Sequence, residues 1–547
     1  MVQYKYQIRE VQVMSFHTND SQQISMFDSF NLLTEREQKA LVKSWAKVFA
    51  EEIFPTIDEE RFSVLYSADK ASRPNTPVNI IIGALILKEL LNLSDDEVVE
   101  NLMLDFRFRY ALHTTSFDEQ PLSDKSLSRF RQRCYDYEVL TGIDLYHGCV
   151  TELAEKTAKL MGLDGRIRRM DSLMVEANIR KLSRMELLYR CVSKMVLYLN
   201  KNGMKDRIFP MDHYCDPDDF NRFIYHSRST DTDDRIAILL RDADILLEKC
   251  KDLEDVTEYQ LLVRCISEQT VVEDDHRRLK TKADGAMNSD IMQSPVDPDA
   301  TFREKAGKEH RGYTANIEET VGQNGSVVTD YQFEQNNVSD SAMLKDHLEK
   351  MNEQSEETIL IADGAYSGTD NSDLASSKNV KLITTDLTGK DVDVVMGAFE
   401  FNDDGTEVLS CPAGNKPKSC TYIKQTGVCQ ASFAKDVCEH CPYRIHCHPK
   451  TYKRVCKVKV SKKMRERARM KANMNTEEFK NYGRLRNGVE TVPSILKNVY
   501  DVNKMRVHGK LRCKFFFGCK IAALNFRKLF RYRMGLGHYA PNPVLAG

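Results

Sequence analysis

Strand-like and helix-like segments alternate between about residues 165 and 385, and this alternation most constrains the fold. Strand-like runs lie on both sides of Asp171, Ser172 and Leu173 in GRIRRMDSLMVEANI, and a buried strand in ETILIADGAYSG ends at Asp363. Helical SAMLKDHLEKMNEQ precedes that strand, and a helix and the strand NVKLITTD follow it. Strands that alternate with helices predict an α/β fold, in which helices cover a sheet and ligands gather at the strand ends.

A polar helical segment and a hairpin separate these two strands. The segment from about 181 to 284 shows no obvious catalytic spacing. In HRGYTANIEETVGQNGSVVTDYQFE, the residues Gln323, Asn324 and Gly325 mark a hairpin turn. We therefore expect a helical insertion within a sheet-forming region.

The first 150 residues are expected to be helical after a polar tail. LTEREQKALVKSWAKVFAEEIF and SDDEVVENLMLDFRFRYAL show apolar residues at helical spacing. The apolar run VNIIIGALILKELLNL contains Lys88 and Glu89 and is too short to span a bilayer, so it predicts a buried helix.

The segment PLSDKSLSRFRQRC predicts a further helix that buries Leu127 and Phe130, with Ser123 or Asp124 as its cap. A short helix, a turn and a basic helix resemble a helix-turn-helix DNA-binding unit. An ordinary amphipathic helix with a solvated arginine face is the alternative. The residues expected to face outward are Ser126, Arg129, Arg131 and Arg133.

The distribution of charge favours a nucleic-acid partner. The 547-residue chain has a net charge of −2, yet residues 444–533 contain 26 Lys or Arg and 5 Asp or Glu. Such asymmetry favours binding to a polyanion. We expect no signal peptide and no membrane partner, and therefore a cytoplasmic protein whose 15 Cys are reduced unless they bind metal.

Cysteines cluster between residues 411 and 447. Cys438, Cys441 and Cys447 form a C-x2-C-x5-C set, and Cys411 is the favoured fourth thiolate. Two sulfurs of a C-x2-C pair can meet one tetrahedral ion, so the pattern predicts a structural Zn2+ site. Unligated thiols and an iron–sulfur cluster are the alternatives. Three nearby histidines are possible substitute ligands: His440, His446 and His448.

Three carboxylates are candidates for a catalytic metal site. Asp171 interrupts a strand-like run, Asp363 ends another strand, and Glu490 lies on a late helix in RLRNGVETVPSILKN. Two divalent ions about 3.5–4 Å apart assist phosphodiester hydrolysis or transfer, and they prefer Asp and Glu oxygens. Each residue also has an ordinary alternative: a turn or cap for the aspartates, and a helical ion pair with Arg486 for Glu490.

Eight stretches, in order, carry a resemblance to a known family: RFSVLYSADKASRP, PLSDKSLSRFRQR, RMDSLMVEAN, SPVDPDATFREKAGKEHRGY, ADGAYSG, CPAG, CEHCPYRIHC and GVETVPSILK. From about Arg61 to Arg533 the chain resembles the DDE transposases of bacterial insertion sequences. The branch it resembles has a helical N-terminal domain and a Cys-rich segment before the final Glu helix. The resemblance implies an RNase H-like catalytic core in which Asp171, Asp363 and Glu490 bind Mg2+ (or Mn2+).

A related insertion-sequence signature, Y-x2-R-x3-E-x6-K, partly fits the final Glu region. Arg486, Glu490 and Lys497 match it, and Tyr482 lies one residue before the expected Tyr. On one helix these four side chains would share an arc of about 80°. That face would carry an aromatic ring, two phosphate-binding cations and the metal-binding acid. Pro493 is an objection to a straight helix, because it removes a backbone hydrogen bond.

The resemblance implies a bacterial, nucleoid-associated enzyme that binds terminal inverted repeats as a homodimer on DNA. It would catalyse strand cleavage and strand transfer into target DNA. The alternatives are an RNase H-like nuclease without strand transfer, and a non-catalytic zinc-containing DNA-binding protein.

The residues expected to contact DNA are Tyr482, Arg486, Lys497, Arg129, Arg131 and Arg133. The expected parts are a polar tail (1–30), a helical DNA-binding domain (31–150), the catalytic core (160–405), a Cys-rich insert (406–456) and basic helices that complete the core (457–540).

Overall fold

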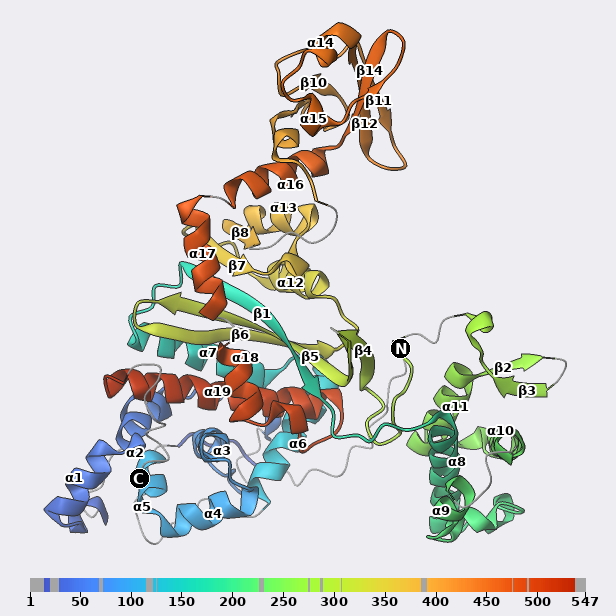
Figure 1. Ribbon diagram of the computed structural model, residues 1–547. Coiled ribbons are helices and arrows are strands. Elements are labelled where there is room, and N and C mark those ends of the chain that lie inside the picture. The colour runs from blue at the N-terminus through green and yellow to red at the C-terminus, as the bar shows by residue number, and fades with distance from the viewer. Residues whose placement is uncertain are drawn as a thin grey trace. The chain divides into compact units, whose positions relative to one another are not determined.

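A computed structural model shows two compact units (Figure 1). The first comprises Met1–Asp164, Ser172–Ser339 and Pro493–Gly547, and the second comprises Gly165–Asp171 and Asp340–Val492. In the described ranges, no helix is long and apolar enough to cross a bilayer. The structure describes residues 14–19, 29–67, 72–114, 122–123, 125–225, 231–273, 276–285, 289–305, 307–384, 391–474, 476–488 and 491–536.

Helices make up the N-terminal part of the first unit. The apolar run VNIIIGALILKELLNL forms helix α3, which is buried along its length except at Leu91, as predicted. The segment predicted as one helix before it is divided at Ser44, whose extended backbone ends α1 and whose hydroxyl accepts from Ala46 N–H in α2. The helices are α1 (Glu35–Lys43), α2 (Trp45–Val48), α3 (Val78–Leu91), α4 (Asp95–Leu104), α5 (Phe106–Ala111), α6 (Ser126–Thr141) and α7 (Leu145–Leu160).

Among the described residues, α5 and α6 do not form the expected helix-turn-helix, and residues 115–121 between them lie outside the described part of the chain. Helix α5 ends at Ala111 and α6 begins at Ser126, whereas the turn of such a unit has about three or four residues. The N-cap of α6 is Lys125, without a side-chain cap, and the Ser123 hydroxyl instead lies 2.9 Å from the Ser126 hydroxyl. Asp124, the other predicted cap, lies outside the described residues.

Helix α6 buries Leu127 and Phe130 as predicted, but the expected outward orientation is wrong for Arg131. Arg131 is 9% exposed and forms an ion pair with Asp95 of α4. Its guanidinium also lies 5.2 Å from the centroid of the Phe516 ring. The prediction failed because two other helices cover this side of α6, which the spacing of its own residues does not indicate.

The fold contains a mixed sheet, as expected. Its strand order is β4-β5-β1-β7-β8, and β6 pairs with β5. Strand β1 runs from the second unit into the first, and Asp171 lies inside it without interrupting it. Strands β1, β7 and β8 pair in parallel, whereas β4, β5 and β6 pair antiparallel. The strands are β1 (Ile167–Glu176), β4 (Thr301–Lys305), β5 (Lys308–Gly322), β6 (Gly325–Gln335), β7 (Thr358–Ala362) and β8 (Val380–Thr384).

The predicted hairpin joins β5 to β6. Strand β5 ends at Gly322 and β6 begins at Gly325, which closes the ladder by pairing with Gly322. Gly325 has a φ of 121°, a backbone conformation that favours glycine. The turn residues of the sequence therefore identified this connection correctly.

Helix α19 (Lys510–Arg533) packs on β6 within the first unit, as predicted for KLRCKFFFGCKIAALNFRKLF (Figure 1). The buried Asn525 side chain accepts from Val328 N–H at 2.9 Å and donates to the Val328 carbonyl at 2.8 Å. The basic start of this segment is part of the helix and not a loop. Five of its cations are paired with acids of the first unit: Lys510 with Glu334, Lys514 with Glu138 (2.6 Å) and Asp144 (2.7 Å), Lys520 with Glu89 (2.6 Å), Lys528 with Glu319 (2.8 Å) and Arg533 with Glu52 (2.7 Å).

The insertion between β1 and β4 is mainly helical and has its own apolar core. That core includes Leu188 and Val192 of α8, Leu239 of α10 and Leu262 of α11. A short hairpin near its end was not predicted, because β2 and β3 are only four residues each. The elements are α8 (Arg184–Lys201), α9 (Asp219–Ile224), α10 (Thr232–Lys249), α11 (Thr257–Gln269), β2 (Thr270–Glu273) and β3 (His276–Leu279).

The two faces of the sheet in the second unit differ. Met170, Leu360 and Ala362 belong to one apolar core with side chains of α12 and α13. Side chains alternate between faces along a strand, so Arg169 and Ile361 lie on the opposite face. The helices of this region are α12 (Asp340–Lys350) and α13 (Thr369–Ser377).

The second unit continues into a small module with its own core, which we call the β11–β14 module (residues 391–474). Phe399, Phe433 and Val458 are buried in that core. The elements from here on are β9 (Glu400–Phe401), β10 (Val408–Ser410), β11 (Ser419–Ile423), β12 (Val428–Ala434), α14 (Lys435–Glu439), α15 (Arg444–Cys447), β13 (Lys450–Thr451), β14 (Val455–Val460), α16 (Lys462–Asn473), α17 (Glu477–Asn487) and α18 (Thr491–Asn498).

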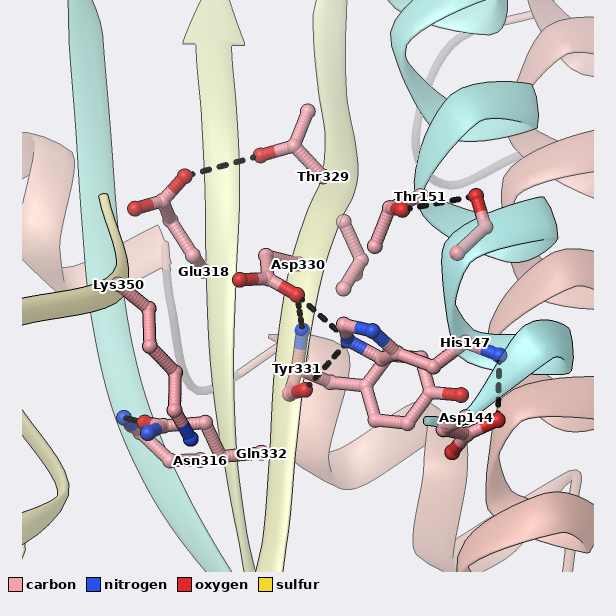
Figure 2. Close-up of polar contacts among 12 residues, drawn as sticks. Asp144, His147, Thr151, Asn316, Glu318, Thr329, Asp330, Tyr331, Gln332 and Lys350 are labelled. Carbon is pink, nitrogen blue, oxygen red and sulfur yellow. Dashed lines mark hydrogen bonds and ion pairs between the residues drawn. The ribbon is translucent and has the colours of Figure 1, made fainter. Parts of the chain in front are cut away.

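A histidine–carboxylate pair joins α7 to β6 within the first unit (Figure 2). His147 Nε2 lies 2.8 Å from Asp330 Oδ1 and 3.0 Å from the Tyr331 carbonyl oxygen. Burial lowers the pKa of His147, but the hydrogen bond and charge of Asp330 outweigh burial, so this pKa is raised above its ordinary value of 6.5. The charged pair therefore stabilises the packing of α7 against the sheet.

We predict that this stabilisation is present at low pH and is lost as the pH rises. The folded-state pKa of His147 lies above the unfolded value. The stabilisation is therefore fully present below about pH 6.5 and is lost as the pH rises through the folded-state pKa. Urea midpoints measured between about pH 5.5 and 8.5 should depend less on pH for His147→Gln than for wild type. The exposed His276 is the control, and equal pH dependence for His147→Gln and wild type would contradict the prediction.

Candidate active site

Asp171 lies in β1, and Asp363 directly follows the neighbouring parallel strand β7. The ladder pairs Ile167 with Ile359 and Arg169 with Ile361. Asp171 and Asp363 each lie two residues beyond the last of these pairs, so the same register places them opposite each other. Neighbouring strands lie about 4.8 Å apart, and side chains at the same register point to the same face. The two carboxylates therefore share one face of the sheet, opposite the face covered by α12 and α13.

Asp363 combines a local role with a long-range contact. Its Oδ1 accepts from Ala365 N–H at 2.8 Å and caps the short helix Gly364–Tyr366, which is the ordinary role for an Asp after a strand. Its Oδ2 lies 3.8 Å from Arg486 Nη2, and both side chains are 28% exposed. One oxygen is thus held by the turn, while the other faces a cation from α17.

Helix α17 is held against this face by Arg169, which is buried in β1. Arg169 Nη1 donates to the Leu485 carbonyl at 2.9 Å, near the end of the helix. A Cβ at Gly488, the C-cap of α17, would lie only 2.4 Å from Arg169 Nη1. Arg169 was not among the predicted site residues, although a charged residue two positions before Asp171 in a strand was the available signal.

Glu490, the third residue of the expected triad, lies outside the described residues. In sequence it falls between α17 and α18. Among the residues that the structure describes, no group of three or more His, Cys, Asp or Glu could hold a metal ion. The described part of the site therefore consists of two carboxylates and the helix that precedes Glu490.

The described residues of the helical face predicted around Glu490 are divided between two helices. Tyr482 and Arg486 lie on α17, whereas Lys497 lies on α18. The chain leaves the first helix at Gly488, and Pro493 lies in the first turn of the second, where its missing N–H breaks no helical hydrogen bond. The proline thus marks a new helix and not a kink in a continuous one.

The three arginines of α6 that were predicted to contact DNA differ in how exposed their charges are. Arg129 is exposed on α6. Arg133 is half-buried, with its guanidinium 4.7 Å from the centroid of the Tyr66 ring. Since Arg131 is buried against Asp95, Arg129 has the most accessible charge of the three.

The four predicted zinc ligands line one small cavity of about 20 Å3 in the β11–β14 module: Cys411, Cys438, Cys441 and Cys447. A cavity of this size has room for about one water-sized particle. Burial, with the neighbouring thiols, raises the pKa of Cys438 to about 11 and that of Cys447 to about 12. Four thiols gathered at one cavity fit a site that a cation would complete, although in the described structure they do not form a metal-binding group.

Two of the three histidines proposed as substitute ligands have other partners. His446 Nδ1 lies 2.6 Å from Asp393 Oδ2, and His440 Nδ1 lies 3.0 Å from the Asp436 carbonyl oxygen. No histidine is among the described residues that line the thiol cavity. Sequence reasoning missed Cys456, whose thiol interacts with that of Cys438.

We predict opposite effects for two glycines of the α17 region. Gly488→Ala should displace Arg169, weaken the hydrogen bond to Leu485 by about 1 kcal/mol and loosen the helix. Gly483→Ala is the matched control, because a Cβ there meets no atom within 4 Å and should stabilise the helix by up to about 1 kcal/mol. Hydrogen exchange of α17 should be faster in Gly488→Ala and slower in Gly483→Ala, and equal protection in both would refute this.

Two family models match the chain. One, described as a transposase DDE domain, matches residues 410–530, and the other, described as a transposase domain (DUF772), matches residues 37–133. The first range contains the β11–β14 sheet, Arg486 and Glu490, and the second contains most of the N-terminal helices. No curated protein and no solved structure matches the chain. The two matches support a DDE transposase of an insertion sequence, and transposases of this kind are nucleotidyl-transfer enzymes that act on DNA.

Proposed function

We propose that this transposase binds the terminal inverted repeats of its insertion sequence and catalyses metal-dependent strand cleavage and strand transfer. Asp171, Asp363 and Glu490 are its catalytic residues. The observation that carries the proposal is the register of β1 and β7, which aligns two carboxylates on one face of a sheet. The match of residues 410–530 to a transposase DDE domain supports the assignment of Glu490. The mixed sheet with helices on its faces supports an RNase H-like core.

The acidic residues fit hard divalent cations. Asp171, Asp363 and Glu490 would hold Mg2+ (or Mn2+), since such ions prefer carboxylate oxygens. When bound, these ions activate the attacking oxygen and stabilise the leaving oxygen of phosphoryl transfer. Arg486, 3.8 Å from Asp363, would bind the phosphate beside the scissile bond, and Arg169 keeps the helix that carries it in position.

Two further cations and one tyrosine would hold the DNA outside the reacting centre. Lys497 on α18, Tyr482 on α17 and the exposed Arg129 on α6 are available for backbone contacts. The N-terminal helices would recognise the terminal repeats, a role supported by their match to a transposase domain. Because two ends of an element must be joined, the active complex would contain two copies of the chain on DNA.

The thiol cavity would hold a structural Zn2+ through Cys411, Cys438, Cys441 and Cys447. Four thiolates fill a tetrahedral shell and leave no position for a substrate, so this ion would stabilise the β11–β14 module and take no part in the chemistry. Its binding would require loss of protons from thiols whose pKa is raised, so affinity would fall as the pH falls.

We predict that Asp171→Asn, Asp363→Asn and Glu490→Gln each reduce Mg2+-dependent cleavage of a duplex carrying the terminal repeat by roughly a hundredfold or more. Each change removes a negative ligand and keeps the side-chain volume. The control is Asp373→Asn, an exposed residue of α13. If Glu490→Gln cleaved at the wild-type rate, the triad assignment would be wrong.

The products distinguish the alternative functions. Joined DNA products indicate strand transfer, whereas cleaved products alone indicate a nuclease. Wild type that binds DNA without cleaving it would indicate a non-catalytic protein.

We predict that the purified protein contains about one zinc ion per chain. Cys441→Ser should abolish most of this zinc, because it removes one of the four thiolates. Cys420→Ser is the matched control, since Cys420 interacts with Cys429 and does not line the thiol cavity. Elemental analysis of the three proteins measures the effect, and zinc-free wild type or a zinc-loaded Cys441→Ser variant would exclude this site.

A further inference from the structure

The outer face of the β11–β14 sheet carries a group of lysines. The sheet has the strand order β11-β12-β14-β13 and forms part of the second unit (Figure 1). Along β14, Cys456, Val458 and Val460 are buried, whereas Lys457 and Lys459 alternate with them and project from the other face. The strand therefore separates an apolar inner face from a basic outer face.

Two of these lysines lie directly opposite each other. Lys450 of β13 pairs in register with Lys457 of β14. Their ammonium groups lie 5.9 Å and 5.3 Å from the centroid of the Tyr452 ring, which is 43% exposed. Like charges opposite each other destabilise a sheet, and the ring offsets part of this cost through cation–π attraction. The repulsion that remains would be relieved by an anion bound over the pair.

No acid of the described structure forms an ion pair with the lysines of this face. Between residues 450 and 459 the sequence contains five Lys or Arg and no Asp or Glu. Within the described ranges, Lys450, Lys457 and Lys459 form no ion pair, in contrast to the cations of α19. Their charge is therefore available to a ligand.

The lysines line an open cavity of about 680 Å3. Two acids also line it, but Asp391 is paired with Lys471 at 2.5 Å and Asp393 with His446 at 2.6 Å. Arginine, whose planar fork suits bidentate binding of carboxylates, is absent from the described residues of the lining. A set of point charges along a strand suits a row of phosphates better than an acidic peptide.

We propose that this lysine face, made by Lys450, Lys457 and Lys459, binds the sugar-phosphate backbone of double-stranded DNA. The inference rests on the proposed function for its choice of partner. The contact is independent of base sequence and separate from Asp171, which lies on β1, and from Asp363, which directly follows β7. Tyr452 is a positioning residue that holds two of the lysines side by side.

The test compares two sets of three lysines in the full chain. Lys450→Gln/Lys457→Gln/Lys459→Gln removes the face, and Lys416→Gln/Lys418→Gln/Lys424→Gln removes the same charge from exposed positions beside the opposite edge strand, β11. The dissociation constant for a terminal-repeat duplex is measured at several salt concentrations. We expect the first variant to bind roughly tenfold more weakly at low salt, with the slope of log K against log salt reduced by about 3. The second should match wild type.

A charge-conserving variant separates lost charge from lost structure. Lys450→Arg/Lys457→Arg/Lys459→Arg should bind duplex within about threefold of wild type, since it keeps three phosphate contacts. Equal losses in the Arg and Gln variants would overturn the proposal, as would an unchanged slope in the Gln variant. Preference of wild type for an acidic peptide over duplex DNA would also overturn it.

Mg2+-dependent cleavage by wild type distinguishes this inference from the proposed function. If wild type cleaves DNA and the Gln variant binds it normally, the inference fails and the proposed function stands. If wild type binds duplex through this face without cleaving it, the inference stands and the catalytic proposal fails.

Discussion

Parallel pairing of β1 with β7 is the interaction on which the candidate site depends. Asp171 and Asp363 share a face only in the observed register, since a slip of one residue would turn one of them toward the opposite face. That opposite face is apolar, and Leu360 and Ala362 are buried there with side chains of α12 and α13. The apolar core of the second unit therefore specifies where the carboxylates lie, although it contributes no chemistry itself.

Docking of α17 depends on a buried charge beside the same carboxylates. The guanidinium of Arg169 donates to a helix carbonyl, and Gly488 leaves room for it. A buried cation destabilises a fold unless it is well paired. The hydrogen bond from Arg169 to the Leu485 carbonyl offsets part of this cost and fixes the position of α17. Arg486 reaches Asp363 from the same helix, which links the folding of α17 to the electrostatics of the site.

The basic residues of the C-terminal region fall into two groups with different surroundings. In α19, lysines such as Lys514 and Lys528 pair with acids of the first unit and stabilise its packing. In the β11–β14 module, the lysines opposite each other have no such partners within the described structure. A count of charges along the sequence adds both groups together, and so overestimates the positive charge that DNA can contact.

Local patterns in the sequence determined the alternation of strands and helices, the β5–β6 turn and the buried helices α3 and α19, because periodicity and turn chemistry act over a few residues. They also singled out Asp171, Asp363 and the four clustered cysteines. Only the tertiary structure decided that the two aspartates align, that Arg131 is buried, that the chain forms separate helices before and after Glu490, and that four thiols meet at one cavity. These outcomes depend on packing between segments far apart in the sequence, whose contacts outweigh local preference and leave no local signal.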